Sequence, residues 1–283
     1  MRLLLLEEFV VHENVETFDV QILLDFFAAA YCIHTAVFCC SALGWPVRRN
    51  RRITICIRLD MLLNVTFSWS DYVHSCKRVC EVSWKIFVAQ RNVDLLLERE
   101  LLWATNRRDS LARIPDESLL AVISQECLPW RVNPNRVLKL VKESKYTRSL
   151  IASEARRLYM YRQLNKTRGG SPDLMICCPG QDPLTHPQLS GCATMSTVIS
   201  STSLLWADGL TPARSLSPAE VLASQGFCTL PEHVTYPGME TSFFWDREGR
   251  GRSGCAQAGN AMNVQVMGIE KLIKFRMLSE GRL

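Results

Sequence analysis

The first sixty residues alternate between strand and helix patterns, and this order constrains the fold more than any other feature. The apolar run Phe9 to His12 predicts a buried strand, and Asp19 precedes a helical pattern of apolar residues that continues to Ala30. A second strand is predicted over Ile33 to Phe38, and residues 53–59 alternate between apolar and polar side chains, which predicts a third. Strand, helix, strand and strand in this order predict an α/β fold.

A helix with both ends specified is predicted within the stretch Arg214 to Phe227. Ser217 is a favourable N-cap, and Pro218 occupies the first helical position. Glu220 stands three residues after Ser217 and completes a capping box, and Gly226 follows as a stop signal. The pattern therefore predicts a short helix between Ser217 and Gly226.

A Gly-Asn turn opens the last predicted helix. The stretch Gln257 to Ala261 contains this turn and precedes an apolar-periodic pattern that runs to about Phe275. Backbone N–H groups and an amide side chain at a helix N-terminus form a natural site for anionic groups. An ordinary turn is the alternative interpretation of this stretch.

A basic loop lies between the second and third predicted strands. Gly44-Trp45-Pro46 predicts a turn, and four arginines follow it within six residues: Arg48, Arg49, Arg51 and Arg52. Composition alone is consistent with a solvated loop or with a nuclear-import patch.

Four blocks of the chain, in this order, resemble the motifs of DNA cytosine-5 methyltransferases. That family has Glu-Asn-Val at a strand end, which matches Glu13 to Val15. Its Gly-x-Pro-Gln-x-Arg-x-Arg block matches Gly44 to Arg51. Its Arg-x-Leu-Thr-x-x-Glu block, followed by Gln-Gly-Phe, matches Arg214 to Phe227, and its Gln-x-Gly-Asn-Ala/Ser block matches Gln257 to Ala261. Two positions differ from the family, since Val47 replaces a glutamine and Ser217 replaces a threonine.

The resemblance implies an α/β fold with a partial Rossmann-like methyltransferase sheet and a mostly helical or irregular target-recognition lobe. Residues 1–60 would form the C-terminal half of the sheet, and residues 61–206 the recognition region. Residues 207–283 would carry the last two blocks and a helix near 263–275 that packs back on the sheet.

The resemblance also implies roles for residues of the first two blocks. The family extrudes a cytosine from duplex DNA, because the ring cannot be reached inside the stack. Glu13 would contact ring nitrogen 3, Arg51 the base carbonyl oxygen, and Arg49 a phosphate or the active-site loop. Arg48 and Arg52 would contact the backbone of double-stranded DNA. We therefore expect Glu13, Arg49 and Arg51 to be the catalytic residues.

The methyl donor of the family is S-adenosyl-L-methionine. Four residues of the last block would help to close its pocket: Gln257, Gly259, Asn260 and Ala261. The family's Phe-x-Gly-x-Gly cofactor loop and its Pro-Cys nucleophile, which precede Glu-Asn-Val, have no counterpart here. Cys178-Pro179 reverses the nucleophile pair and follows the Arg-x-Arg block, so it is not taken as the nucleophile.

We therefore expect an N-terminally incomplete chain that does not methylate DNA by itself. A second chain that supplies the missing half is the implied partner of a split enzyme, and a truncated gene model is the other origin. The alternatives are a DNA-binding module without catalysis and a degenerate product that does not fold stably, because three strands leave a sheet edge exposed.

The middle of the chain carries no motif of the family. Helices are predicted after Pro115 and after Thr147. The second would carry Arg156, Arg157 and Arg162, which face phosphate in one interpretation and solvent in the other.

Composition is consistent with these expectations. The 283 residues carry a net charge of +5, which suits nucleic acid as a partner but is not diagnostic. The twelve cysteines show no repeated Cys-x-x-Cys pattern, and no metal site is expected. The short apolar start Met1 to Leu6 does not suit a signal peptide, and polar residues interrupt the apolar region Val20 to Trp45. The expected location is inside the cell, nuclear or cytoplasmic, with no membrane span.

Overall fold

The structure is a computed structural model that describes nine segments of the chain. These are residues 7–61, 69–88, 98, 101–102, 104–170, 174–185, 194–195, 205–208 and 214–227. The chain divides into two compact units, with the boundary between Val82 and Ser83. Each unit is described by itself below.

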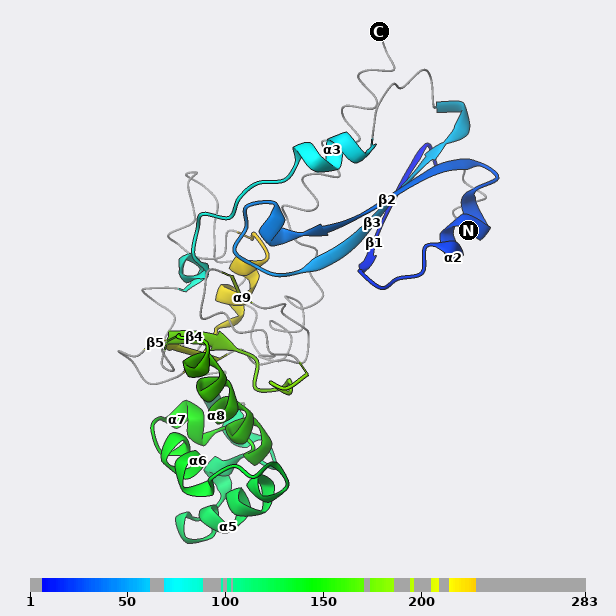
Figure 1. The fold of residues 1–283 in the computed structure, drawn as a ribbon. Helices are drawn as coiled ribbons and strands as arrows, with labels where there is room; N and C mark the ends of the chain where they lie inside the picture. Colours follow the sequence, from blue (N-terminus) through cyan, green and yellow to red (C-terminus); the bar gives the residue numbers. More distant parts are fainter. Residues whose placement is uncertain are drawn as a thin grey trace. The chain divides into compact units, whose positions relative to one another are not determined.

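The first unit contains a three-stranded sheet. Its strands are β1 (Phe9–Val15), β2 (Tyr31–Cys39) and β3 (Asn50–Arg58), and helix α2 (Gln21–Phe27) connects β1 to β2 (Figure 1). The strand order is β1-β3-β2, and β3 is antiparallel to both neighbours. Strands β1 and β2 therefore run in the same direction, with β3 between them.

Strand β3 is buried on both of its faces. Ile53, Ile55 and Ile57 are buried as the alternating pattern predicts, but Thr54 and Cys56 on the opposite face are buried as well. The second face is covered because a small core of Val10, Tyr31 and Cys56 packs there, together with Phe27, Ala30 and Ile33. The strand predicted from the alternating pattern is thus the central strand of the sheet.

The sequence patterns of the first unit predict its strands and its helix correctly, but some of these elements begin or end at other residues in the structure. Asp19 does not occupy the N-cap position of α2, which is Val20, but its carboxylate accepts a hydrogen bond from the Gln21 N–H at 2.9 Å. Strand β1 continues through Val15, so Glu13 lies within the strand rather than after it. The extension follows from pairing, since Glu13 lies opposite Ile53 and Val15 opposite Arg51.

The second unit contains a bundle of helices around one apolar core. Its helices are α5 (Asp116–Cys127), α6 (Pro134–Val141), α7 (Lys145–Arg148) and α8 (Ala152–Thr167) (Figure 1). Helices α5, α6 and α8 pack against one another. The core includes Leu119, Ile123, Val137, Leu140 and Leu158. The helices predicted after Pro115 and after Thr147 are confirmed as α5 and α8, although α8 begins only at Ala152 and Thr147 belongs to the short helix α7.

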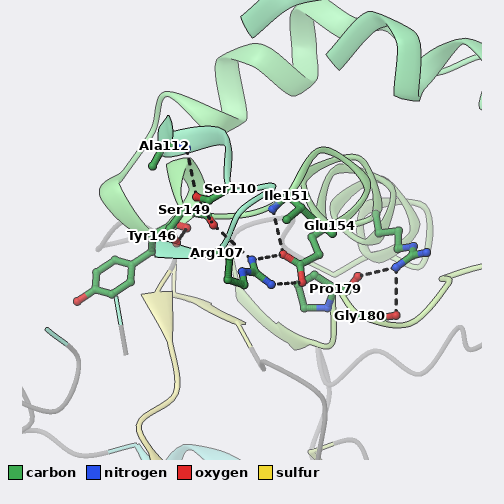
Figure 2. A network of polar contacts seen from close by, with 10 residues as sticks. Arg107, Ser110, Ala112, Tyr146, Ser149, Ile151, Glu154, Pro179 and Gly180 are labelled. Atoms are coloured by element: carbon green, nitrogen blue, oxygen red, sulfur yellow. Dashed lines mark hydrogen bonds and ion pairs between the residues drawn. The ribbon is translucent and has the colours of Figure 1, made fainter. Parts of the chain in front are cut away.

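A polar clamp holds the start of α8 (Figure 2). Both oxygens of Glu154 accept from the Arg107 guanidinium, at 3.0 and 2.6 Å. Arg107 also donates to the Ser149 carbonyl at 3.3 Å, and the Ser110 hydroxyl donates to the same carbonyl at 2.9 Å. Glu154 further accepts the Ile151 N–H at 3.1 Å. One carboxylate thus ties the helix start to a segment 47 residues earlier.

A second small sheet precedes the predicted capped helix. Strands β4 (Leu174–Cys177), β5 (Leu205–Asp208) and β6 (Arg214–Ser215) form it in the order β4-β5-β6, with antiparallel pairs. Helix α9 (Pro218–Ser224) follows and packs against η3 (Trp84–Phe87). The other described elements are η1 (Cys40–Ala42), η2 (Leu59–Met61), α3 (Trp69–Ser75), η4 (Leu111–Arg113) and η5 (Leu128–Trp130).

The predicted mixed α/β class is confirmed by the small antiparallel sheet and the helices around it. The residues Gln257, Gly259, Asn260 and Ala261 and the helix predicted near 263–275 lie outside the described residues. In the part of the chain that the structure describes, no helix is both long and apolar enough to cross a membrane.

Candidate functional site

The structure brings Glu13 and Arg51 together at one end of the first sheet. Glu13 lies opposite Ile53, two residues from Arg51 on β3, so the two side chains share one face of the sheet. Glu13 Oε1 lies 3.1 Å from Arg51 Nε, and the side chains are 11% and 16% exposed. The resemblance gives each residue a contact with the base, and the ion pair between them is an addition from the structure.

The hydrogen-bonding capacity of Glu13 is incompletely used. Its Oε1 atom is buried and, within the described segments, makes no contact with hydrogen-bond geometry. Arg51 instead donates from Nη1 to the carbonyl of Asn50 at 2.8 Å. A buried carboxylate oxygen with a guanidinium beside it is able to bind a donor group of a ligand.

Arg49 extends the charged cluster into the interior. It is only 2% exposed, although it lies in a loop of consecutive basic residues. Burial and, to a smaller extent, the charge of Arg51 lower the pKa of Arg49 to about 10, against the opposing effects of Glu13 and Cys40. Arg49 is therefore protonated at neutral pH, and it adds positive charge behind the Glu13–Arg51 pair.

Cys40 lies against the same cluster. Its thiol donates to the Arg49 carbonyl at 3.6 Å. Burial and, to a smaller extent, Cys39 raise the pKa of Cys40 to about 12, while Arg49 and Arg51 oppose the shift. At neutral pH the residue is a thiol and therefore a poor nucleophile.

The two remaining arginines of the basic loop have different environments. Arg48 is exposed. Arg52 donates from Nε and Nη2 to the Glu16 carbonyl at 3.0 and 2.8 Å. Arg52 therefore holds the segment after β1, and its contact with DNA stays a prediction.

Glu16 and Asn50 belong to the site although sequence reasoning did not select them. Asn50 Nδ2 donates to Glu16 Oε2 at 2.7 Å, which fastens the end of β1 to the start of β3. Their positions in the sequence could have indicated both residues, since Glu16 directly follows Glu-Asn-Val and Asn50 lies between Arg49 and Arg51.

The turn before the arginines is built from apolar packing. Val47, which replaces the glutamine of the family block, is fully buried, and its N–H donates to the Trp45 carbonyl at 2.7 Å. Gly44 has a φ of +85°, a conformation that an L side chain rarely adopts. Packing of Val47 thus anchors the loop where a polar side chain was expected.

A cavity of about 460 Å³ lies beside Glu13. It is lined by Val10, Val11, His12, Glu13, Leu23, Phe27 and Cys56. Its volume lies within the usual range for small-molecule sites, roughly 300–1,000 Å³. Burial lowers the pKa of His12, against a smaller opposing effect of Glu13, so the imidazole is neutral at pH 7. The side chains of Val10, His12 and Cys56 lie on the face of the sheet opposite to Glu13 and Arg51, so the cavity is mainly apolar, with one neutral imidazole.

The third block forms a second Glu–Arg pair, within the second unit. Glu220 is fully buried and accepts from Arg214 at 2.7 and 3.0 Å. It also accepts the Ser217 N–H at 2.7 Å, while Ser217 Oγ accepts the Glu220 N–H at 3.3 Å. This is the predicted capping box, and Gly226 ends the turn after α9 with a φ of +91°.

The three arginines of α8 contact protein groups. Arg156 is 2% exposed, pairs with Glu126 at 2.9 Å and lies over the Trp130 ring at 4.1 Å. Arg162 pairs with Glu143 at 2.7 Å. Arg157 donates to the carbonyls of Pro179 and Gly180 at 3.3 and 3.1 Å.

The described cysteines near the reversed Cys-Pro pair are also unsuited to nucleophilic attack. Burial raises the pKa of Cys178 to about 11, and burial also raises the pKa of Cys177. Among the residues that the structure describes, no group of three or more His, Cys, Asp or Glu side chains could hold a metal ion.

Comparisons with known proteins add no family assignment. No protein-family model matches the sequence, and a search of curated proteins finds no significant match. Function is therefore inferred from the residues of the candidate site and from their resemblance to the four family blocks.

Proposed function

We propose that this chain is the cytosine-recognising part of a DNA cytosine-5 methyltransferase. It would bind duplex DNA and hold an extruded cytosine against Glu13 and Arg51. The observation that supports this most strongly is the Glu13–Arg51 pair at 3.1 Å, with one buried carboxylate oxygen that lacks a hydrogen bond within the described segments.

The position of the pair in the sheet supports a ligand site. Strands β1 and β2 of this open sheet are parallel to each other and are joined through α2, with the antiparallel β3 between them. Ligands of such open sheets bind outside the carboxyl ends of the parallel strands. Glu13 lies near the carboxyl end of β1, and Arg51 near the start of the antiparallel β3, so both are at that end.

The pair suits the edge of a cytosine ring. Ring nitrogen 3 would lie against the Glu13 carboxyl group, and the adjacent carbonyl oxygen would accept from Arg51. The carboxyl group would then help to protonate nitrogen 3, which makes ring carbon 5 more nucleophilic. Arg49 and Arg51 add positive charge that attracts the DNA backbone. The methyl group would come from S-adenosyl-L-methionine, toward which Gln257, Gly259 and Asn260 are the proposed residues of this chain.

The nucleophile and the glycine-rich cofactor loop would come from residues outside this sequence, either in a longer form of the same protein or in a second chain. No Pro-Cys pair and no Phe-x-Gly-x-Gly sequence occurs in the chain. Cys40 and Cys178 do not replace the nucleophile, because burial raises the pKa of both thiols. The purified chain is therefore expected to transfer no tritiated methyl group to cytosine, since general acid–base help alone contributes only about 10²–10⁴-fold. Transfer that Glu13→Gln abolishes would contradict this expectation.

A DNA-binding module without catalysis is the second candidate function. The exposed Arg48 favours it, because an exposed cation suits a backbone contact without any base contact. The two candidates differ in one measurable property, which is a gain in affinity from an unpaired cytosine.

The test compares two labelled duplexes in fluorescence anisotropy. One carries a cytosine opposite an abasic site, and the other is abasic on both strands at that position. An unpaired base costs less to extrude, so the first duplex should bind more tightly by about 1–3 kcal/mol if a bidentate base contact forms. Glu13→Gln should remove this gain, and the matched control Glu117→Gln, at an exposed glutamate of the second unit, should keep it. Equal binding of both duplexes by the unmodified chain would leave only the second candidate.

A further inference from the structure

Positive charge is concentrated in one part of the second unit. Residues 104–170 contain fourteen Lys and Arg and six Asp and Glu, which gives +8, whereas the whole chain carries +5. The remaining residues together are therefore slightly acidic. The helical bundle is thus the basic part of a nearly balanced chain.

Most of the acidic side chains in this part are engaged in ion pairs. Asp116 pairs with Arg148 at 2.8 Å, Glu126 with Arg156 at 2.9 Å and Glu143 with Arg162 at 2.7 Å. Glu154 pairs with Arg107 at 2.6 Å. The surplus of positive charge is therefore carried by other Lys and Arg side chains.

Four of these cations recur at every third residue along α6 and into α7. They are Arg136, Lys139, Lys142 and Lys145, which we call the α6 ridge, and all four are exposed. The opposite face of α6 is apolar and buried through Val137, Leu140 and Val141. At 100° per residue, Arg136, Lys139 and Lys142 lie within an arc of about 120° and span roughly 9 Å of helix axis.

Neighbouring groups neutralise little of the positive charge of the α6 ridge. Lys142 lies 3.7 Å from Asp116, a carboxylate that is already paired with Arg148. Arg136 donates to the Tyr159 hydroxyl at 3.4 Å, which does not compensate its charge. In the described part of the chain, no ion pair engages Arg136, Lys139 or Lys145.

We propose that the α6 ridge binds the phosphodiester backbone of duplex DNA. A row of cations on a rigid helix, fixed by a buried apolar face, suits a row of phosphates and needs no base contact. An anionic membrane fits less well, because a surface helix must insert its apolar face and that of α6 is inside the bundle core. The choice of DNA as the nucleic acid rests on the proposed function, but the ridge is separate from the Glu13 site.

The test uses the full chain and a short labelled duplex at several salt concentrations. Arg136→Gln together with Lys139→Gln should weaken binding, and the slope of log K against log salt should become less steep by about 1.8, since each phosphate contact contributes about 0.9. The matched control removes two exposed cations elsewhere, Lys77→Gln with Lys85→Gln, and should leave affinity and slope nearly unchanged. The charge-conserving variant Arg136→Lys with Lys139→Arg should keep both.

Three results would overturn the proposal. The first is an unchanged slope in the Arg136 and Lys139 double variant, and the second is an equal loss in the Lys77 and Lys85 control. The third is tighter binding to phosphatidylserine vesicles than to DNA at equal salt. Glu13→Gln should leave the salt slope unchanged, so failure of the cytosine site and failure of the ridge are distinguishable. The side chains of Arg136 and Lys139 are both exposed, and an unchanged thermal unfolding transition would show that their double variant is folded.

Discussion

Two Glu–Arg pairs, one in each unit, use the same chemical groups in different ways. Glu220 is fully buried, contacts Arg214 through both oxygens and also accepts the Ser217 N–H. Glu13 makes one contact of 3.1 Å with Arg51, and its Oε1 atom makes no hydrogen bond within the described segments. One carboxylate has its protein partners in place, and the other retains capacity for a ligand.

The difference indicates what each pair does. A saturated carboxylate in the interior stabilises its surroundings, since removal leaves a charged partner and an N–H group unpaired. An incompletely bonded carboxylate at a sheet end contributes less to folding and is available for chemistry. Replacement of Glu220 should therefore reduce stability more than ligand binding, and replacement of Glu13 should reduce ligand binding more than stability.

The largest effect is expected for Glu220→Ala. The substitution removes the carboxylate that pairs with Arg214, a side chain only 12% exposed, and the acceptor of the Ser217 N–H. Breaking one side of a buried pair costs about 3–5 kcal/mol, and urea denaturation should show this loss. A loss below about 1 kcal/mol, the range of exposed pairs, would contradict the structural role of Glu220.

The elements of this pair were predictable from the sequence because their interactions are local. Ser217, Glu220 and Gly226 lie within ten residues of one another, and the capping box forms as predicted. The class of the first unit was predictable for the same reason, since each strand carries its own apolar pattern.

The strand order and the buried arginines were not predictable locally. Placement of β3 between β1 and β2 depends on pairing over more than thirty residues, and this pairing carries Glu13 to Arg51. Arg156 is buried because Glu126 and Trp130 come from another part of the chain. Contacts between residues that are close in the sequence are therefore predictable from a pattern, whereas contacts between distant segments are known only from the fold.

Arg51→Ala should have the second largest effect. Glu13 loses its ion-pair partner, but Arg49 still acts on its charge, and both side chains of the pair are partly exposed. We expect a loss of about 1–2 kcal/mol in the free energy of unfolding, less than for a fully buried pair. DNA affinity should fall in the same variant, with heparin as the polyanion control. Unchanged DNA affinity and salt slope would show that Arg51 is not a DNA contact.

Ser217→Ala tests how much of the stabilisation around Glu220 comes from the helix cap. Only the N-cap acceptor is removed, and both contacts between Arg214 and Glu220 remain. Loss of a serine cap costs about 1 kcal/mol. The urea midpoint should therefore shift by less than in Glu220→Ala, and Ser83→Ala, which removes an exposed cap of η3, should shift it less again. Equal losses in Ser217→Ala and Glu220→Ala would place the stabilisation in the cap rather than in the ion pair.

Glu13→Gln should change stability least. The amide keeps the size of the side chain, and Arg51 keeps its hydrogen bond to the Asn50 carbonyl, so no cation is left without a polar contact. Loss of the attraction is offset by the smaller cost of burying a neutral group, and we expect a change of no more than about 0.5 kcal/mol. Glu220→Gln is the matched substitution, and it should cost far more, because an amide NH2 group replaces the oxygen that accepts from Arg214 Nη2 and the charge of Arg214 loses its counter-charge. If urea denaturation instead shows equal losses for the two glutamine variants, Glu13 is a structural residue like Glu220. Its incomplete hydrogen bonding would then give no support to a cytosine site, since a group that stabilises the sheet as strongly as Glu220 has no capacity left for a ligand.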